Sequence, residues 1–217
     1  MSFPMRFRNI LTALGLVMSL GLAGCTTTTG DKTEVAKTTK VQIFSDSYGS
    51  VTDAGYALPA IPIQKVDKKF HRQIVDYATT EKPGTVVVNT RERFLYYVMP
   101  RGKAVRYGIG VGKQGFAWQG EAYIAWKQAW PTWHPPKEMA ERKPEVAKYV
   151  EKGMDPGLRN PLGARAMYLY RGGNDTMFRI HGTNQPWSIG QAMSSGCVRM
   201  MNHDVIDLYA RVDVGSK

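Results

Sequence analysis

GTVVVNTRERFLYYVMPRGKAVRYGIGVG, residues 84–112, is the stretch of the chain that decides the fold. It holds three runs rich in Val, Ile and Tyr, at residues 84–90, 93–99 and 103–112, with short polar turns between them. Such runs are typical of strands, because β-branched and aromatic side chains pack well on a pleated surface. Strands this close in sequence favour an antiparallel meander, since short turns can join antiparallel neighbours.

The rest of the C-terminal half continues in the same style. Further strands are expected at residues 121–127, 166–170 and 177–181. Proline precedes two charged, Ala-containing runs, which predicts short helices at residues 137–142 and 145–150. Asn202 is expected to be the N-cap of a last helix over residues 203–211. The predicted fold class is therefore mainly β with short helices.

The N-terminus has the organisation of an export signal. Residues 1–9 carry Arg6 and Arg8 and no acid, and residues 10–23 are uncharged and short for a membrane span. Residues 22–25, Leu-Ala-Gly-Cys, resemble a bacterial lipobox. This resemblance implies a signal peptide over residues 1–24, lipidation of Cys25 and a periplasmic protein anchored to the outer membrane by its lipid.

Between this signal and the strands, the composition changes twice. Residues 25–62 begin Thr- and Lys-rich with few large apolar side chains, and they are expected to form a flexible tether that starts at the lipidated cysteine. Residues 63–83 are mixed in composition and are expected to pack on the flank of the domain. The main domain is expected to cover residues 84–214.

The formal net charge of +11 indicates polyanionic partners but does not identify which kind. A basic surface favours polyanions, which include nucleic acid, anionic lipid and anionic wall polymers. Because the N-terminus indicates export, a membrane reached through the lipid anchor and the cell wall are the expected partners. Nucleic acid is not.

The cysteine and histidine content points to a site near the C-terminus. If Cys25 carries a lipid, Cys197 is the only remaining cysteine, and an exported lone thiol is either buried and inert or kept for chemistry. His181 lies sixteen positions before it and offers an imidazole that could activate it. Gly196 leaves the neighbouring amides uncovered by a side chain, so they could face an oxyanion.

Other site types are less favoured by the pattern. The remaining histidines show no ligand spacing with Cys197, so no metal is expected. The glycine-rich run at residues 108–115 lacks the spacing of a phosphate-binding loop and is expected to be a hairpin. A buried thiol beside a structural histidine stays open on composition alone.

Five blocks of the sequence together resemble a known family, the L,D-transpeptidase catalytic domain of the YkuD type. The blocks are GTVVVNTRERFLYYV at residues 84–98, WPTWHPP at 130–136, NPLGARAMYLY at 160–170, IHGT at 180–183 and SSGCVRMMN at 194–202. The resemblance implies a β-sandwich or barrel-like domain that acts on the peptide stems of peptidoglycan without a cofactor. One departure is Ser195, which stands where many members carry a second histidine, and this puts fine substrate contacts in doubt.

The resemblance also implies roles for particular residues. Cys197 is the expected nucleophile, His181 the base and the Gly182 carbonyl the group that orients the imidazole. The amides of Gly196 and Cys197 are the expected oxyanion hole. The expected substrate-binding residues are Arg199, Ser195 and Trp187, although an ion pair with the last helix remains an alternative for Arg199 and core packing one for Trp187.

The implied reaction has several outcomes that the sequence leaves open. The thioester on Cys197 would be taken by the side-chain amine of a second stem, giving a 3→3 cross-link, or by an amine of an outer-membrane protein or lipoprotein. If water takes it, the enzyme is an L,D-carboxypeptidase or endopeptidase. A non-catalytic lipoprotein that binds the wall through its basic surface is the alternative from another class.

Overall fold

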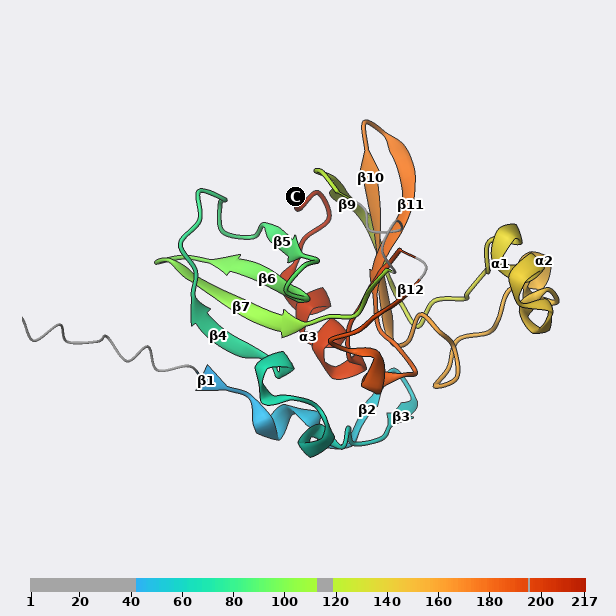
Figure 1. The fold of residues 1–217 in the computed structure, drawn as a ribbon, viewed down its shortest axis with the longest axis horizontal. Helices are drawn as coiled ribbons and strands as arrows, with labels where there is room; N and C mark the ends of the chain where they lie inside the picture. The colour runs from blue at the N-terminus through green and yellow to red at the C-terminus, as the bar shows by residue number, and fades with distance from the viewer. Residues whose placement is uncertain (1–41, 113–118, 195) are drawn as a thin grey trace, which may run out of the picture. The chain divides into compact units, whose positions relative to one another are not determined.

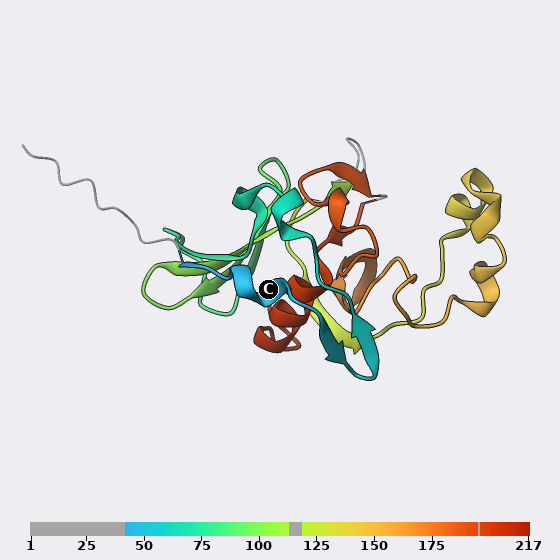
Figure 2. The same cartoon turned by 90° about the horizontal axis from the view of Figure 1, so that it is seen from below.

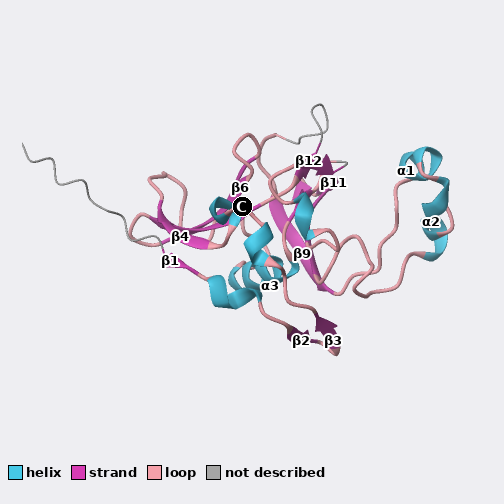
Figure 3. Ribbon diagram, turned by 60° about the horizontal axis from the view of Figure 1, so that its bottom comes forward, coloured by secondary structure: helices cyan, strands magenta, loops and turns pink. Residues whose placement is uncertain are grey.

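The computed structural model describes residues 42–112, 119–194 and 196–217. Strands dominate them (Figure 3). The strands are β1 (Gln42–Ile43), β2 (Val51–Asp53), β3 (Tyr56–Leu58), β4 (Gln73–Asp76), β5 (Val86–Asn89), β6 (Phe94–Met99), β7 (Lys103–Gly108), β8 (Val111–Gly112), β9 (Tyr123–Ala129), β10 (Arg165–Arg171), β11 (Asn174–His181), β12 (Ala192–Ser194) and β13 (Val198–Arg199). The α-helices are α1 (Lys137–Arg142), α2 (Tyr149–Lys152) and α3 (Asn202–Arg211). Short 3-10 helices cover Ser45–Tyr48, Ile63–Lys65, Lys68–Phe70, Pro144–Val146 and Pro186–Ser188.

Two sheets form the body of the fold. The first has the order β1-β4-β7-β6-β5 and the second the order β13-β11-β10-β9. Two strand pairs, β12 with β8 and β2 with β3, complete the β structure. Figure 1 shows α3 between the two large sheets, and Figure 2 shows α1 and α2 to the side of them. The prediction of a mainly β domain with short helices is confirmed.

The predicted meander forms the centre of the first sheet. Strands β5 and β6 pair antiparallel, and β6 pairs antiparallel with β7. Leu95 of β6 and Val105 and Tyr107 of β7 are fully buried. They share one core with Met167 of β10 and with Val205 and Leu208 of α3, so the main core lies between the two sheets and the last helix.

The segment before residue 84 differs from the prediction. Residues 42–62, expected in a flexible tether, carry strands β1 to β3, and Tyr48 and Leu58 among them are 2% and 3% exposed. Residues 63–83 contain β4, which pairs with β7 inside the first sheet. The flexible tether was wrong over residues 42–62, because Tyr48 and Leu58 are buried against the domain even though Val51 remains exposed.

Two smaller corrections concern the helices. The helix expected at residues 145–150 is instead a 3-10 turn, Pro144–Val146, followed by α2. Asn202 is the first residue of α3 and does not cap it, because the N-cap position is Met201. The predicted signal peptide and Cys25 lie outside the described residues. No helix in the described ranges is long and apolar enough to cross a membrane.

Candidate functional site

Strands β11 and β13 bring the predicted nucleophile and base to one face of the second sheet. The two strands are parallel, with His181 opposite Arg199 and Ile180 opposite Val198. Side chains alternate along a strand, so His181, Arg199 and Cys197, two residues before Arg199, face the same side. Cys197 is therefore two residues along the strand from Arg199, the partner of His181, an offset of about 7 Å.

The imidazole of His181 is hydrogen-bonded to the backbone of the next residue. Its Nδ1 lies 2.5 Å from the carbonyl oxygen of Gly182, and the residue is 5% exposed. Burial, helped by the charge of Arg199, lowers the pKa of His181 to about 4. A neutral imidazole that donates from Nδ1 keeps the lone pair of its Nε2 available, which is the state that a general base needs.

The thiol of Cys197 faces the backbone of β11. Its Sγ lies 4.0 Å from the carbonyl oxygen of Met177, and the residue is half-buried. Burial raises the pKa of the Cys197 thiol, while a hydrogen bond from the Arg179 backbone N–H and the charges of Arg179 and Arg199 act in the opposite direction. Both groups therefore favour their neutral forms near pH 7.

Gly196 precedes the thiol in a backbone conformation that suits glycine. Its φ of 128° lies in a region that residues with a side chain rarely adopt. The chain therefore turns sharply before Cys197 without a side chain to cover the neighbouring amides. Ser195, predicted to contact substrate, lies outside the described residues.

Asn202 ties three of the sequence blocks together. Its side-chain oxygen accepts a hydrogen bond from the backbone N–H of Ala164 at 3.0 Å. A Cβ on Gly182 or on Gly163 would come within 2.2 Å of the same oxygen. Both residues must therefore be glycine for Asn202 to fit, and this close packing fixes the peptide that follows His181. The expected capping role was wrong because tertiary partners take the side chain.

Arg199 offers a charge beside Cys197, the predicted nucleophile. Its backbone exchanges two hydrogen bonds with Gly110, at 2.8 and 2.9 Å, which locks the strand in place. Its guanidinium has no ion pair or hydrogen bond with the described residues, so the alternative of an ion pair with the last helix is not seen among them. The arrangement leaves a partly buried cation, the group that best meets a carboxylate.

The other aromatic candidates divide between surface and core. Trp187, in the 3-10 helix Pro186–Ser188, is 63% exposed and free to contact a ligand. Trp130 is 5% exposed, and its indole N–H donates to Asp53 at 2.7 Å. Core packing, the alternative left open for Trp187, therefore describes Trp130 and not Trp187.

Three residues near the thiol were missed by the sequence analysis. Arg179 forms a bidentate ion pair with Asp175, both contacts being 2.7 Å, and its guanidinium lies 4.5 Å from the centre of the Tyr168 ring. Arg179 could have been found from strand periodicity, because it lies two residues before His181 and so shares its face. Tyr168 could not, because it meets Arg179 through the pairing of β10 with β11, and a register shift lies between Arg179 and Asp175.

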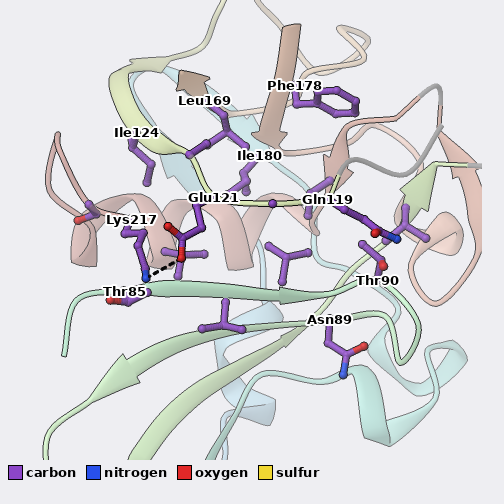
Figure 4. A pocket seen from close by; sticks show the side chains of 18 of the residues that line it. Thr85, Asn89, Thr90, Gln119, Glu121, Ile124, Leu169, Phe178, Ile180 and Lys217 are labelled. Carbon is purple, nitrogen blue, oxygen red and sulfur yellow. Dashed lines mark hydrogen bonds and ion pairs between the residues drawn. The ribbon is translucent and has the colours of Figure 1, made fainter. Parts of the chain in front are cut away.

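A hollow of about 530 Å³ opens on the opposite, core-facing side of the same strands (Figure 4). Its apolar wall includes Ile124, Leu169 and Ile180. At its rim Lys217 pairs with Glu121 at 3.1 Å. It reaches the backbone at Gly196, but Cys197 and His181 do not line it. The hollow is thus behind the candidate site and not part of it.

No group of three or more His, Cys, Asp or Glu side chains suited to a metal occurs within residues 42–112, 119–194 and 196–217.

Comparison with known proteins gives a consistent family. Residues 83–217 match the family model described as YkuD, L,D-transpeptidase catalytic domain. Two proteins of Escherichia coli (strain K12), the probable L,D-transpeptidases ErfK/SrfK and YbiS, are 35% and 33% identical over 143 and 140 residues. Each match covers 61% of this chain and 42% of the relative, so the chain spans less than half of those relatives.

One crystal structure is similar over most of its own length. It comes from Brucella melitensis and is described as a probable carnitine operon oxidoreductase caia, a description that applies to that protein. The identity is 52%, the TM-score is 0.50, and the match covers 72% of this chain and 96% of that one.

Proposed function

The chain belongs to the YkuD family of L,D-transpeptidase catalytic domains, and from this premise we propose that it transfers peptidoglycan stem peptides through a thioester on Cys197. The observation that carries the proposal is the placement of Cys197 and His181 on one sheet face, with the imidazole anchored to the Gly182 carbonyl. A nucleophile, a base and a group that orients the base are the parts that acyl transfer needs.

The first half-reaction forms the acyl-enzyme. Sγ of Cys197 attacks the carbonyl of the third, diamino residue of the stem while Nε2 of His181 takes the thiol proton. The amides of Gly196 and Cys197 stabilise the oxyanion. The bond to the fourth residue, D-Ala, then breaks, and His181 returns its proton to the departing amine. His181 acts here as a general base from a neutral pair, which agrees with its pKa of about 4.

The second half-reaction releases the acyl group. The side-chain amine of a second stem attacks the thioester, its proton passes to His181, and the thiolate leaves to give a 3→3 cross-link. An amine of an outer-membrane protein or lipoprotein would be joined to the wall by the same steps. Arg199 supports substrate binding, because its guanidinium can meet a stem carboxylate in a bidentate manner. No step needs a cofactor.

We also propose the location from the N-terminal sequence. Residues 1–24 would direct export, and a lipid on Cys25 would hold the domain at the outer membrane in the periplasm. Labelled palmitate that enters the wild type and not Cys25→Ala would support the anchor, and equal labelling of both would rule it out.

The test of the reaction uses disaccharide-tetrapeptide and the full chain. Mass spectrometry should find a dimer that lacks one D-Ala with the wild type and with the matched control Cys25→Ala, and none with Cys197→Ala. Tripeptide alone would make the protein a hydrolase. Untouched substrate, together with unchanged wall phenotypes in Cys197→Ala, would favour the non-catalytic wall-binding protein and end the proposal.

A further inference from the structure

The face of the second sheet that carries Cys197 continues into a row of stacked side chains. The register pairs Arg179 of β11 with Tyr168 of β10, and Tyr168 with Trp126 of β9. The rings of Trp126 and Tyr168 are stacked, with centroids 3.4 Å apart and planes 8° apart. Because Cys197 receives a hydrogen bond from the Arg179 backbone, the row runs from the thiol across three strands to Trp126.

A bulge widens this row into a platform. Tyr168 pairs with Trp126 and Leu169 with Ile124, so Ala125 has no partner in β10. Residues three apart on a regular strand face opposite sides, and the extra residue cancels that alternation. Tyr123 and Trp126 therefore face the same way, and they are 36% and 41% exposed.

We name this surface the aromatic platform. It consists of the exposed Tyr123 and Trp126, the half-buried Tyr170 and the buried Tyr168, with the Asp175–Arg179 ion pair beside it. Ile124 and Leu169 point the other way, into the main core. The aromatic platform therefore lies on the face of these strands opposite to the one that contributes Ile124 and Leu169 to the core.

We propose that the aromatic platform binds an N-acetylated sugar ring of the glycan strand that carries the donor stem, which deepens and rests on the proposed function. The negative face of an aromatic ring attracts the polarised C–H groups of a sugar ring. The carboxylate and guanidinium of Asp175 and Arg179 offer acceptors and donors to its hydroxyl and acetamido groups. Clusters of Trp, Tyr and Arg commonly carry the energy of recognition.

The length of the stem favours this occupant over a second peptide. Trp126 is three inter-strand spacings from Cys197, which is about 14 Å. The three residues between the sugar and the attacked carbonyl span about 10 Å when extended. With the linking group added, a donor held at Cys197 and laid along the row brings its sugar to the exposed ring of Trp126.

The first experiment measures binding without catalysis. The full chain is titrated with a β-1,4-linked tetramer of N-acetylglucosamine, which has no stem peptide, by isothermal calorimetry. We expect Trp126→Ala to weaken binding about tenfold or more. Leu158→Ala is the matched control, because Leu158 is an apolar side chain of similar exposure, 44%, outside the platform, and it should bind as the wild type does. No binding by the wild type, or equal binding by Trp126→Ala, would overturn the proposal.

The second experiment separates this inference from the proposed reaction. Trp126→Ala should raise KM for disaccharide-tetrapeptide about tenfold and leave kcat/KM for the bare tetrapeptide within about twofold of the wild type. An equal fall in kcat/KM for both substrates would indicate a structural role for Trp126 and would contradict the proposal. A wild type that binds the tetrasaccharide through Trp126 but turns over neither substrate would sink the reaction and leave the platform standing.

Discussion

The side-chain oxygen of Asn202 lies 3.0 Å from the backbone nitrogen of Ala164, and that contact fixes the floor of the candidate site. Ala164 is fully buried, so its N–H has no access to water. The same oxygen occupies the space that a side chain on Gly182 would need. The side-chain amide of Asn202, at the start of α3, thus fixes the position of Gly182, whose carbonyl is hydrogen-bonded to His181.

This packing predicts coupling between Asn202 and Gly182. Gly182→Ala should destabilise the protein by on the order of 1–3 kcal/mol, because its Cβ would meet Asn202. Asn202→Ala should cost about 1–3 kcal/mol, because it leaves the Ala164 N–H unpaired. The double variant should cost about 1 kcal/mol less than the two together in urea denaturation. Additive costs would show that the two residues do not share this space.

The electrostatics predict that Cys197 and His181, the proposed catalytic pair, are both neutral near pH 7. Burial raises the pKa of Cys197 and lowers that of His181 to about 4, and both shifts favour uncharged forms near pH 7. The alkylation rate of the Cys25→Ala variant by iodoacetamide should therefore keep rising with pH beyond about 8.5, the pKa of a free cysteine. A rate that is already level between about pH 5 and 7 would reveal a thiolate–imidazolium pair instead.

The guanidinium of Arg199, which has no ion pair with any described residue, predicts a binding effect. Arg199→Met should raise KM for disaccharide-tetrapeptide about tenfold, equivalent to about 1.4 kcal/mol, since a carboxylate contact made equally in the ground and transition states changes KM more than kcat. Arg199→Lys should recover part of the loss because the charge remains without the bidentate fork. Arg142→Met, in α1, is the control. A fall in kcat with KM unchanged would exclude the binding role.

The buried Tyr48 predicts that the N-terminal segment stabilises the domain. Its hydroxyl accepts from the backbone N–H of Arg72 at 2.7 Å and donates to Asp204 of α3 at 3.0 Å. Tyr48→Phe leaves that N–H unpaired and should cost about 1–3 kcal/mol in urea denaturation. Tyr149→Phe, whose hydroxyl has no hydrogen bond with the described residues, should cost less than about 0.5 kcal/mol. If both variants lowered the free energy of unfolding equally, residues 42–49 would not stabilise the domain through Tyr48.

Burial raises the pKa of Asp204 to about 7, which predicts how this network responds to pH. A carboxyl whose pKa is higher in the folded than in the unfolded state favours folding below about pH 4 and loses that contribution as pH rises through about 7. Replacing it with a neutral isostere, Asp204→Asn, should therefore make the free energy of unfolding fall less between pH 5 and 8. An unchanged pH dependence in urea denaturation would show that Asp204 is not the group that titrates.

The sequence by itself determined the fold class, the meander of β5 to β7 and the pairing of His181 with Cys197 as the candidates for chemistry. These features can be predicted from local patterns, because strand-forming runs, the turn residues between them and the order of the blocks depend only on residues that are close in sequence. The resemblance of the blocks then pointed to the family, which the match over residues 83–217 shows.

The tertiary structure alone decided where the isolated polar and apolar residues go. Tyr48 and Asp204 lie 156 positions apart, so no local pattern announces their hydrogen bond. The sequence around Asn202 predicts a helix cap, but its side-chain oxygen instead accepts a hydrogen bond from the backbone N–H of Ala164. The bulge at Ala125 turns Trp126 and Tyr123 to one face only because β10 fixes the register. Each of these depends on contacts between distant segments, and such contacts exist only after the sheets have closed on their common core.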